Sequence, residues 1–532
     1  MASPERLAAV ARLLAAGAWQ DAEAAARTAA HDDPIDPDAR RLLGIAVAAM
    51  GEPDRAAPIM AAAADIAPDR DHPCVDLALL RPPLPRPLVS RQFSTCLRLT
   101  PADAGLRLAF AGFLLEIGIP AQAEEILQEA PASAAVSHMR GLIQSEQSQF
   151  LPAIVSFEQA VAKNPDAAAS WSNLGMILKI EGRFADAIAA HDRAVALKPA
   201  NARFRVNRAV ALLKAGLWDR AWRDYEARLE LGGVPIDPLR LMPSLRPGDS
   251  LNGLTVVAMH EDGFGDTLQF LRYLPLLAGH GARVIACVPR ALVRIMRTVP
   301  GVASVVTDAK RLPPHDFVCP MFSLPRVFAT TVDRIPPVPE LTLDPALVRH
   351  WRARLPIGGL RTGLVWAGQA RPSLPGFGTL DRRRSASLAA FAPLAGVSGL
   401  SLVSLQAGPA ARQVRPAGME LADPMPDVTD FADTAAIVAG LDVIVAVDTA
   451  VVHLAGLTRK PVFLLDRYDG CWRWLSGRAD SPWYPRLTVF RQDRPDDWSG
   501  AIARVAASLE AMALFHGVGI RHAPLREHAF VA

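Results

Sequence analysis

A glycine turn that carries an acid, GFGD at residues 263–266, follows a short apolar run and precedes a segment with helical spacing. Asp266 therefore stands at the start of a predicted helix, where a carboxylate caps the helix and complements its dipole. At the lip of a cleft the same carboxylate could act as a general base, because glycines let the backbone approach a substrate closely. From residue type alone, both roles stay open for Asp266.

The turn does not match a dinucleotide-binding fingerprint. That motif needs a third glycine three positions after the second, and an acid at the end of the next strand. Here Leu268 occupies the third position, and the next expected strand, ARVIACV, runs into Pro289 without an acid. Both specific requirements fail, which argues against a nicotinamide-dependent dehydrogenase.

A second candidate site is DTAVVHLAG at residues 448–456, which follows a buried apolar strand. Free amides at the start of the next helix, together with the Thr449 hydroxyl, form a natural site for a diphosphate. His453 lies one helical turn after Thr449 and could face the same ligand. The alternative is structural, with Asp448 as a helix cap and His453 as a packed histidine.

A third feature is the loop at residues 367–385, which combines Gly, Pro and Ser with Arg371, Arg382, Arg383 and Arg384. Only six of the 57 basic residues are lysines, so phosphate recognition must depend on arginines and backbone amides. A mobile arginine loop over a helix start suits a phosphorylated donor that must be enclosed before reaction. The alternative is a solvated surface loop.

These motifs lie on alternating strands and helices that begin near residue 250, which is typical of parallel α/β layers. The expected strands are TVVAM, ARVIACV, ASVVT and HDFVCP, then TGLVWAG, LSLVSLQ, LDVIVAVD and KPVFLLD. A proline-rich linker, RIPPVPELTLDP, separates the two sets, and the helix WSGAIARVAASLEAMAL closes the second. Two such units that face each other bind ligands at the carboxyl ends of their strands.

The first half of the chain repeats a helix, a glycine turn, a second helix and a proline. Prolines recur about every 34 residues, at positions 34, 68, 101, 131, 165 and 199. Residues 168–199 resemble the tetratricopeptide pattern at Trp171, Leu174, Gly175, Gly182, Ala187, Ala194 and Pro199. Small residues are needed where the two helices cross, and proline ends the second helix. We expect about seven units, with the one around residues 70–103 degraded by RPPLPRP.

Stacked helical repeats usually hold a peptide or protein on their concave face. Asn173 and Asn207 occupy the same position of adjacent repeats. A side-chain amide can both donate to and accept from a peptide backbone, so the two predict an asparagine pair that binds an extended acceptor protein. The alternative is that asparagine simply suits this position of the repeat.

Composition argues against several classes of function. A net charge of +3 over 532 residues gives little support for general nucleic-acid binding. Five cysteines without a CxxC pair indicate reduced thiols rather than a disulfide framework or a zinc site. No membrane span is expected, and the N-terminal segment has the pattern of an amphipathic helix and not of a signal peptide. We therefore expect a cytoplasmic protein.

Residues 250–515 resemble the heptosyltransferase-like glycosyltransferases, whose fold is GT-B, two facing Rossmann-like units. The resemblance is carried by GFGDTLQFLRYLP, GLVWAGQ, RRRS, SLVSLQ, DFADTAAIVAGLDVIVAVDTAVVHLAG, KPVFLL and WRWLSGRADSPWYP. It covers about half of the chain. Joined to tetratricopeptide repeats, the sequence is similar to bacterial protein O-glycosyltransferases, notably those that modify flagellin, and in layout to the eukaryotic O-GlcNAc transferases.

This resemblance implies a role for each matched residue. Asp266 falls on the acid that such enzymes use as the base toward the acceptor hydroxyl. The donor-binding residues that it implies are Asp448, Thr449, His453, Arg384, Trp366, Gln369 and Gln406. Arg384 stands near the cation that contacts the diphosphate, where many heptosyltransferases have lysine. Enzymes of this type generally need no metal, and no DxD-like cluster stands at a strand end, so neither a metal nor another cofactor is expected.

The sequence thus predicts an α-helical tetratricopeptide-repeat solenoid followed by an α/β GT-B fold of two facing Rossmann-like units. The expected ranges are 1–235 for the repeats, 250–345 for the acceptor-side unit, 346–515 for the nucleotide-sugar side and 516–532 for a tail. The expected activity is an inverting, metal-independent transfer from a nucleotide-activated sugar to Ser/Thr hydroxyls of a protein bound by the repeats, with flagellin as the expected acceptor. The alternatives are a lipopolysaccharide-type sugar transferase and a non-catalytic adaptor with a decayed transferase domain. The sugar and its nucleotide, a nucleoside diphosphate or a cytidine monophosphate, stay open.

Overall fold

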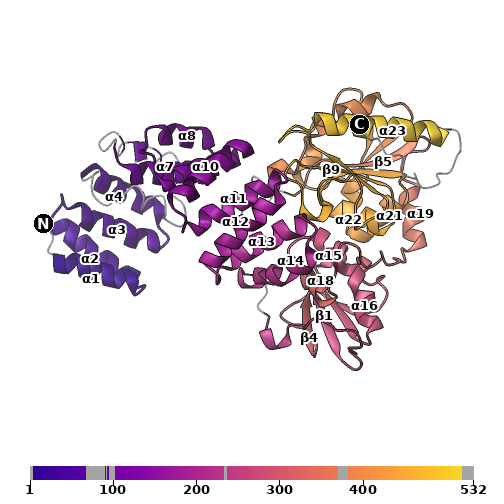
Figure 1. The fold of residues 1–532 in the computed structure, drawn as a ribbon, viewed down its shortest axis with the longest axis horizontal. Helices are drawn as coiled ribbons and strands as arrows, with labels where there is room; N and C mark the ends of the chain where they lie inside the picture. The colour runs from indigo at the N-terminus through magenta and orange to yellow at the C-terminus, as the bar shows by residue number, and fades with distance from the viewer. Residues whose placement is uncertain are drawn as a thin grey trace. The chain divides into compact units, whose positions relative to one another are not determined.

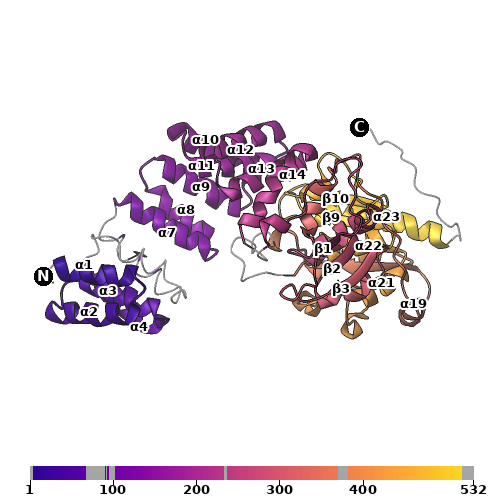
Figure 2. The ribbon, with the colours of Figure 1, turned by 90° about the horizontal axis from the view of Figure 1, so that it is seen from below.

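The computed structural model describes residues 4–66, 90, 93–94, 97, 102–232, 236–369 and 381–517. The chain divides into two compact units, Met1–Ile177 and Leu178–Ala532. Within the described residues, the first unit contains helices only. The second unit begins with helices and continues into two parallel β-sheets (Figures 1 and 2).

The first unit consists of successive antiparallel helix pairs. Its helices are α1 (Pro4–Ala15), α2 (Trp19–Asp32), α3 (Pro37–Ala49), α4 (Pro53–Ile66), α7 (Ala104–Glu116), α8 (Pro120–Gln128), α9 (Ala134–Glu146) and α10 (Phe150–Lys163). Helix α11 (Ala168–Ile180) runs across the boundary between the units. The predicted repeat of paired helices is confirmed, while Pro68, Pro101 and most of the degraded unit lie outside the described residues.

Two glycines show why small residues recur where paired helices cross. A Cβ on Gly44 of α3 would lie 2.1 Å from Met60 Cγ of α4. A Cβ on Gly141 of α9 would lie 2.7 Å from Phe157 Cε1 of α10. Because protein interiors are close-packed, neither position can accept a side chain unless Met60 or Phe157 shifts.

The second unit starts with helices α12 (Phe184–Leu197), α13 (Ala202–Lys214) and α14 (Trp218–Tyr225). These helices of the repeat pattern pack on the α/β part. Trp218 stacks on Trp483 with ring centroids 5.2 Å apart, and Trp222 Nε1 donates to the Thr330 carbonyl at 2.7 Å. The last repeat and the α/β part therefore share one core.

The first sheet has four strands, β1 (Thr255–Met259), β2 (Arg283–Cys287), β3 (Val302–Val306) and β4 (Phe317–Pro320). Their order is β3-β2-β1-β4, and every pair is parallel. All four strands were predicted as strands, because their apolar runs are short and rich in Val and Ile. Helices α15 (Phe264–Phe270) and α16 (Leu274–Gly279) follow β1, and α17 (Val293–Met296) and α18 (Leu324–Val327) follow β2 and β4.

The second sheet has six parallel strands, β5 (Leu360–Val365), β6 (Leu400–Ser404), β7 (Leu421–Ala422), β8 (Val443–Val447), β9 (Val462–Asp466) and β10 (Leu487–Arg491). Their order is β10-β9-β8-β5-β6-β7. This is the 3-2-1-4-5-6 order of doubly wound nucleotide-binding sheets, and the order reverses between β5 and β8. Helices α19 (Pro345–Arg352), α21 (Phe431–Ala439), α22 (Ala450–Leu457) and α23 (Ser499–Gly517) accompany it. The predicted α/β part is therefore confirmed, while the tail beyond residue 517 lies outside the described residues.

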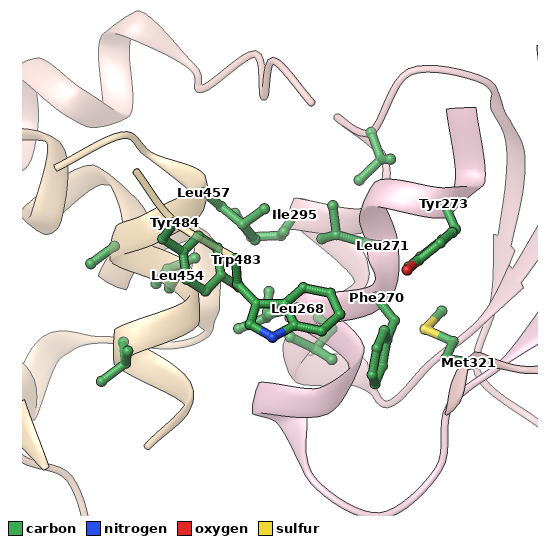
Figure 3. Close-up of a cluster of buried hydrophobic side chains, with 14 of the residues drawn as sticks. Leu268, Phe270, Leu271, Tyr273, Ile295, Met321, Leu454, Leu457, Trp483 and Tyr484 are labelled. Atoms are coloured by element: carbon green, nitrogen blue, oxygen red, sulfur yellow. The ribbon is translucent and has the colours of Figure 1, made fainter. Parts of the chain in front are cut away.

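A shared apolar core joins the two sheet regions. Leu268, Phe270 and Leu271, from the segment after β1, are fully buried together with Leu454, Trp483 and Tyr484 from the second region (Figure 3). Each such side chain contributes about 1.5–3 kcal/mol when it is removed from water. This contact fixes the segment after β1 against α22 and against the segment between β9 and β10.

Among the described residues, no helix combines the length and the apolar character that crossing a membrane requires.

Candidate functional site

Asp266 caps the helix that carries it. Helix α15 begins after Gly263, and the Gly263 amide donates to Asp266 Oδ2 at 3.1 Å. The strand β1 ends just before this turn, so the carboxylate stands at the carboxyl edge of the first sheet. The capping role is thus present in the structure, and it occupies one carboxylate oxygen.

The second oxygen of Asp266 faces an arginine that the sequence motifs did not single out. Arg473 lies in the short 3-10 helix η9 (Trp472–Trp474), and its guanidinium forms an ion pair with Asp266 Oδ1. Arg473 Nε also donates to Gln269 Oε1 at 2.5 Å. Both members of the ion pair are mostly buried, and they come from the two different sheet regions.

The surroundings bring the pKa of Asp266 to about 6, well above its ordinary value. Burial is the largest cause, because it disfavours the charged form, and the negative charges of Asp262 and Asp448 act in the same direction. Arg473 and the Gly263 amide oppose the rise. A carboxyl group with a pKa near 6 can accept a proton at neutral pH, which is the range that suits a general base.

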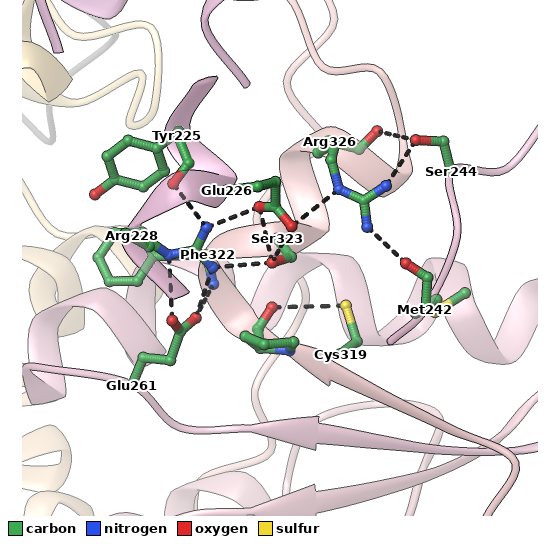
Figure 4. A network of polar contacts seen from close by, with 11 residues as sticks. Tyr225, Glu226, Arg228, Met242, Ser244, Glu261, Cys319, Phe322, Ser323 and Arg326 are labelled. Atoms are coloured by element: carbon green, nitrogen blue, oxygen red, sulfur yellow. Dashed lines mark hydrogen bonds and ion pairs between the residues drawn. The ribbon is translucent and has the colours of Figure 1, made fainter. Parts of the chain in front are cut away.

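Glu261, the first acid of the same turn, is held by the end of the repeat helices (Figure 4). Arg228 contacts it through Nε at 3.2 Å and Nη2 at 3.0 Å, and the Phe322 amide donates to it at 3.1 Å. Arg228 also pairs with Glu226 at 2.7 Å, and Ser323 Oγ donates to Glu226 at 2.9 Å. Glu261 therefore anchors the turn, and Asp266 is the acid of the turn that faces the second sheet.

The segment after β8 presents a helix start with an unused hydroxyl. Thr449 is the N-cap residue of α22, yet its side chain makes no capping hydrogen bond. Thr449 Oγ1 is buried and has no partner in the described part of the chain. The first amides of a helix also lack intrahelical acceptors, so hydroxyl and amides together can receive an anion.

A close approach of two helices brings Asp266 and Thr449 into one site. A Cβ on Gly265 of α15 would lie 3.0 Å from His453 Cδ2 and 3.3 Å from Ala450 Cα, both on α22. Only glycine permits this spacing without displacing the backbone of α22. The charge of Asp448 is in turn near enough to raise the pKa of Asp266.

His453 is packed between aromatic rings. Its ring stacks on Trp474 with centroids 5.5 Å apart, and Nδ1 shares a hydrogen bond with the Tyr484 hydroxyl at 2.9 Å. Burial is the main cause that lowers the pKa of His453 well below its ordinary value, with Arg473 and Arg272 acting in the same direction. The ring is therefore neutral at physiological pH, as the alternative of a packed histidine expects.

Trp366 and Gln406 lie in the interior of the second sheet region. Gln406 Oε1 accepts from the amides of Trp366 at 3.0 Å and Ala367 at 2.9 Å, and its Nε2 donates to the carbonyls of Ala367 at 3.0 Å and Ala407 at 2.9 Å. Trp366 Nε1 donates to the Ala410 carbonyl at 3.2 Å. Gln406 thus ties the end of β5 to the end of β6 and supports the rim of the site.

The end of the basic loop folds back on itself. Arg384 pairs with Asp381 at 3.0 Å and donates to the Gln369 carbonyl at 2.9 Å, while the Gln369 side chain is exposed. Arg383 lies 3.7 Å from Asp469, which also pairs with Arg467 at 2.7 Å. The charge of Asp448 acts on Arg467, so Arg467 is a cation near the α22 start. Arg371 lies outside the described residues.

The two asparagines of the predicted pair are half-buried. Asn173 lies on α11 within the first compact unit, and Asn207 lies on α13 within the second. Each stands on the first helix of its repeat, as the sequence pattern requires.

A cavity of about 380 Å³ adjoins His453 through Tyr484, which belongs to the cavity lining and shares a hydrogen bond with His453. Its lining includes Arg272, Pro336, Lys460, Trp483 and Tyr484, and none of the sequence-predicted site residues. Its lining combines four prolines, two aromatic residues and four cationic residues. Its lining does not include Thr449 or Ala450, which provide the hydroxyl and the first amide at the start of α22.

No described group of three or more His, Cys, Asp or Glu side chains has the arrangement of a metal site.

Comparison with known families identifies tetratricopeptide repeats in the chain. Two family models described as tetratricopeptide repeat match residues 138–200, 181–233 and 13–75. The predicted repeats are thereby confirmed at both ends of the helical region.

Protein FlbA of Caulobacter vibrioides is 26% identical over 344 residues, which cover 59% of this chain. The match spans 56% of the length of FlbA. Among solved structures, a MamA crystal structure is 23% identical and matches 27% of this chain and 87% of its own length, with a TM-score of 0.25. Pseudomonas aeruginosa PilF is 18% identical and matches 43% of this chain and 90% of its own length, with a TM-score of 0.29. TM-scores at this level assign no fold to the chain.

Proposed function

We propose that the chain is an inverting glycosyltransferase of GT-B type that moves a sugar from a nucleotide-activated donor to a Ser or Thr hydroxyl of a protein held by the repeats. The observation that carries the proposal is the close approach of α15 and α22, whose starts carry Asp266 and Thr449 and follow strands of two parallel sheets. Ligands of doubly wound sheets bind at the carboxyl edge, next to the strand where the order reverses. The resemblance of residues 250–515 to heptosyltransferase-like enzymes agrees with this placement.

In the proposed reaction, Asp266 takes the proton from the acceptor hydroxyl. The hydroxyl oxygen then forms a bond to the anomeric carbon, and the bond between that carbon and the donor phosphate breaks. The electron pair leaves with the phosphate. Because the hydroxyl oxygen attacks in line, on the face opposite the leaving phosphate, the configuration at the anomeric carbon inverts. A raised pKa favours Asp266 for this role, because a more basic carboxylate accepts a proton more readily.

The start of α22 would stabilise the leaving phosphate. The amides of Ala450 and Val451 point along the helix axis, and Thr449 Oγ1 has no other partner within the described residues. Preorganised donors of this kind act at the position where negative charge develops. His453 is neutral and contributes packing, or at most one hydrogen bond, rather than charge. Arg467 is therefore a better source of positive charge than His453.

The repeats would supply the acceptor protein. Tetratricopeptide repeats generally bind proteins, and a bound acceptor has a raised local concentration at the site. Flagellin is the acceptor that we propose, on the strength of the resemblance to bacterial flagellin-modifying enzymes. Asn173 and Asn207 remain our candidates for contacts with its backbone.

One observation favours a second candidate, a non-catalytic adaptor. Both carboxylate oxygens of Asp266 have structural partners, so the acid would be retained even without chemistry. A transferase that acts on a lipid-linked glycan is the third candidate, and it needs no acceptor protein on the repeats.

The test is incubation of the full chain with flagellin of the source organism and a panel of nucleotide sugars, followed by intact-mass measurement. We expect a sugar-sized mass increase with one donor, and no increase with the Asp266→Asn variant. Flagellin binding without any mass increase would support the adaptor. Neither binding nor a mass increase with flagellin, but transfer to a lipid-linked glycan, would support the third candidate.

A further inference from the structure

We infer that Arg473 is a positioning residue that holds Asp266 ionised and fixed in direction. The arginine belongs to the second sheet region and the carboxylate to the first. The first region therefore provides the proposed base, and the second provides the residue that positions it. This inference rests on the proposed function, because it assigns Asp266 the role of base.

The contacts of Arg473 leave its guanidinium little freedom. Nη2 contacts Asp266 Oδ1, Nε donates to Gln269 Oε1 at 2.5 Å, and Nη1 contacts Cys471 Sγ at 3.1 Å. The guanidinium carbon also lies 4.7 Å from the centroid of the Trp472 ring and 5.6 Å from that of Phe322. The planar guanidinium has three polar contacts and packs against two rings, so it fixes the direction of the carboxylate that it contacts.

The last two repeat helices, α13 and α14, brace the segment that carries Arg473. Lys214, at the end of α13, donates through Nζ to the Cys471 carbonyl at 3.1 Å and to the Leu475 carbonyl at 2.8 Å. These two carbonyls flank η9 on either side. Trp472 also packs edge-on against Trp218, with ring centroids 6.1 Å apart. The repeat helices therefore hold the arginine that in turn holds the base.

The charged groups around Asp266 leave Arg473 as its main counter-ion. Asp262 on the same turn and Asp448 before α22 are both negative and disfavour the carboxylate. His453 on α22 is neutral, and Glu261 is occupied by Arg228. From the repeat side, the Tyr225 hydroxyl is kept neutral by burial, which raises its pKa. Removing Arg473 would leave a buried carboxylate beside two like charges.

A stability measurement tests the inference without a sugar donor. The pKa of Asp266 is raised in the folded chain, so its contribution to stability is full below its unfolded pKa and is lost as pH rises toward about 6. The difference in melting temperature between the native sequence and Asp266→Asn should therefore change up to about pH 6 and then level off. In an Arg473→Met background, the pKa of Asp266 should be higher. The difference in melting temperature should therefore continue to change up to a pH that is about one unit higher or more.

Three further variants keep the test decisive. Arg473→Lys retains the charge and should restore the original pH range. Arg272→Met removes another buried arginine, one that lies between Trp483 and Tyr484, and should leave the range where the native sequence has it. If Arg473→Met does not fold, Arg473→Gln is neutral, keeps a hydrogen-bond donor and carries the same expectation as Arg473→Met. An unchanged pH range in both Arg473→Met and Arg473→Gln would overturn the inference.

An activity profile separates this inference from the proposed function. With an active donor, Arg473→Met should move the acid limb of the pH–rate profile to higher pH. A merely structural role would instead lower the rate by the same factor at every pH. A shifted stability range with no transfer from any donor would refute the proposed function and leave the coupling of Arg473 to Asp266 intact. Transfer with an unshifted range would do the reverse.

Discussion

The N-terminal ends of α15 and α22 have similar surroundings, but their polar side chains differ in whether they have partners. Each follows a buried parallel strand, and the two helices meet at Gly265. At α15 the acid of the turn has partners within the chain, because Asp266 accepts from the Gly263 amide and pairs with Arg473. At α22 the Thr449 hydroxyl is buried without a partner among the described residues, and no side chain caps the helix.

This difference assigns a separate task to each turn. A closed turn holds one carboxylate in a fixed direction, which is what a base needs. An open turn offers amides and a hydroxyl to an outside group, which is what an anionic donor needs. The predictions below change one turn at a time.

The largest effect is expected at the closed turn. Asp266→Asn keeps an oxygen that can accept from Gly263 but removes the basic carboxylate, so the transfer rate should fall by about 100-fold or more. Rates measured by intact mass at neutral pH would show this. Asp262→Asn, on the exposed neighbour, is the matched control and should cost far less. Full turnover of a well-folded Asp266→Asn protein would mean that the acid is only a cap.

Gly265→Ala should separate the two turns. The added methyl would meet His453 and the backbone of Ala450, so we expect a loss of about 1–3 kcal/mol in the free energy of unfolding. Gly279→Ala is the control, because a Cβ on that helical glycine would meet no neighbouring group within 4 Å, and alanine should be neutral or slightly stabilising there. Denaturant unfolding measures both changes. Equal effects at the two glycines would contradict the close approach of α15 and α22.

The pH dependence of transfer should report the pKa of Asp266. The base works as the carboxylate, so activity should be half-maximal near pH 6, level off above it and fall as pH drops through it. One pH unit below that value the rate should be about tenfold lower. A rate that stays constant as the pH falls through this value would assign proton removal to another group.

The smallest effect is expected at the open turn, in stability. Thr449→Val removes a buried hydroxyl that has no partner within the described residues, so the free energy of unfolding should stay the same or rise by up to about 1 kcal/mol. Asn201→Ala is the matched control, because the Asn201 side chain accepts from the Phe204 amide at the start of α13, and its loss should cost about 1 kcal/mol. A comparable loss at Thr449 would show that its hydroxyl caps α22 after all.

Most of the fold could be predicted because its signals are local. The repeats follow from glycines and prolines at a fixed spacing, and eight strands follow from short apolar runs. Strands β7 and β10 were missed. β7 has only two residues, and β10 alternates Leu, Val and Arg with an exposed Thr488, which is also typical of a surface segment.

The site could be predicted only in part, because its contacts are long-range. Asp266 and Thr449 were found from the turns that carry them. Arg473 was not singled out, although the quoted motif WRWLSGRADSPWYP contains it, because its partner Asp266 lies 207 residues away in the chain. The buried role of Gln406 depends on backbone groups 39 and 40 residues away, which no local pattern reveals.

The most direct test of the two-turn assignment is calorimetric titration of UDP, GDP, CDP and CMP into three proteins, the native sequence, Thr449→Val and Asp266→Asn. We predict that at least one nucleotide binds the native chain and that Thr449→Val weakens this binding about tenfold, the loss of one hydrogen bond to a charged group. Asp266→Asn should bind equally well or more tightly, because it removes a negative charge near the phosphates. Loss of binding in Asp266→Asn with full binding in Thr449→Val would contradict the assignment of donor and base to their turns.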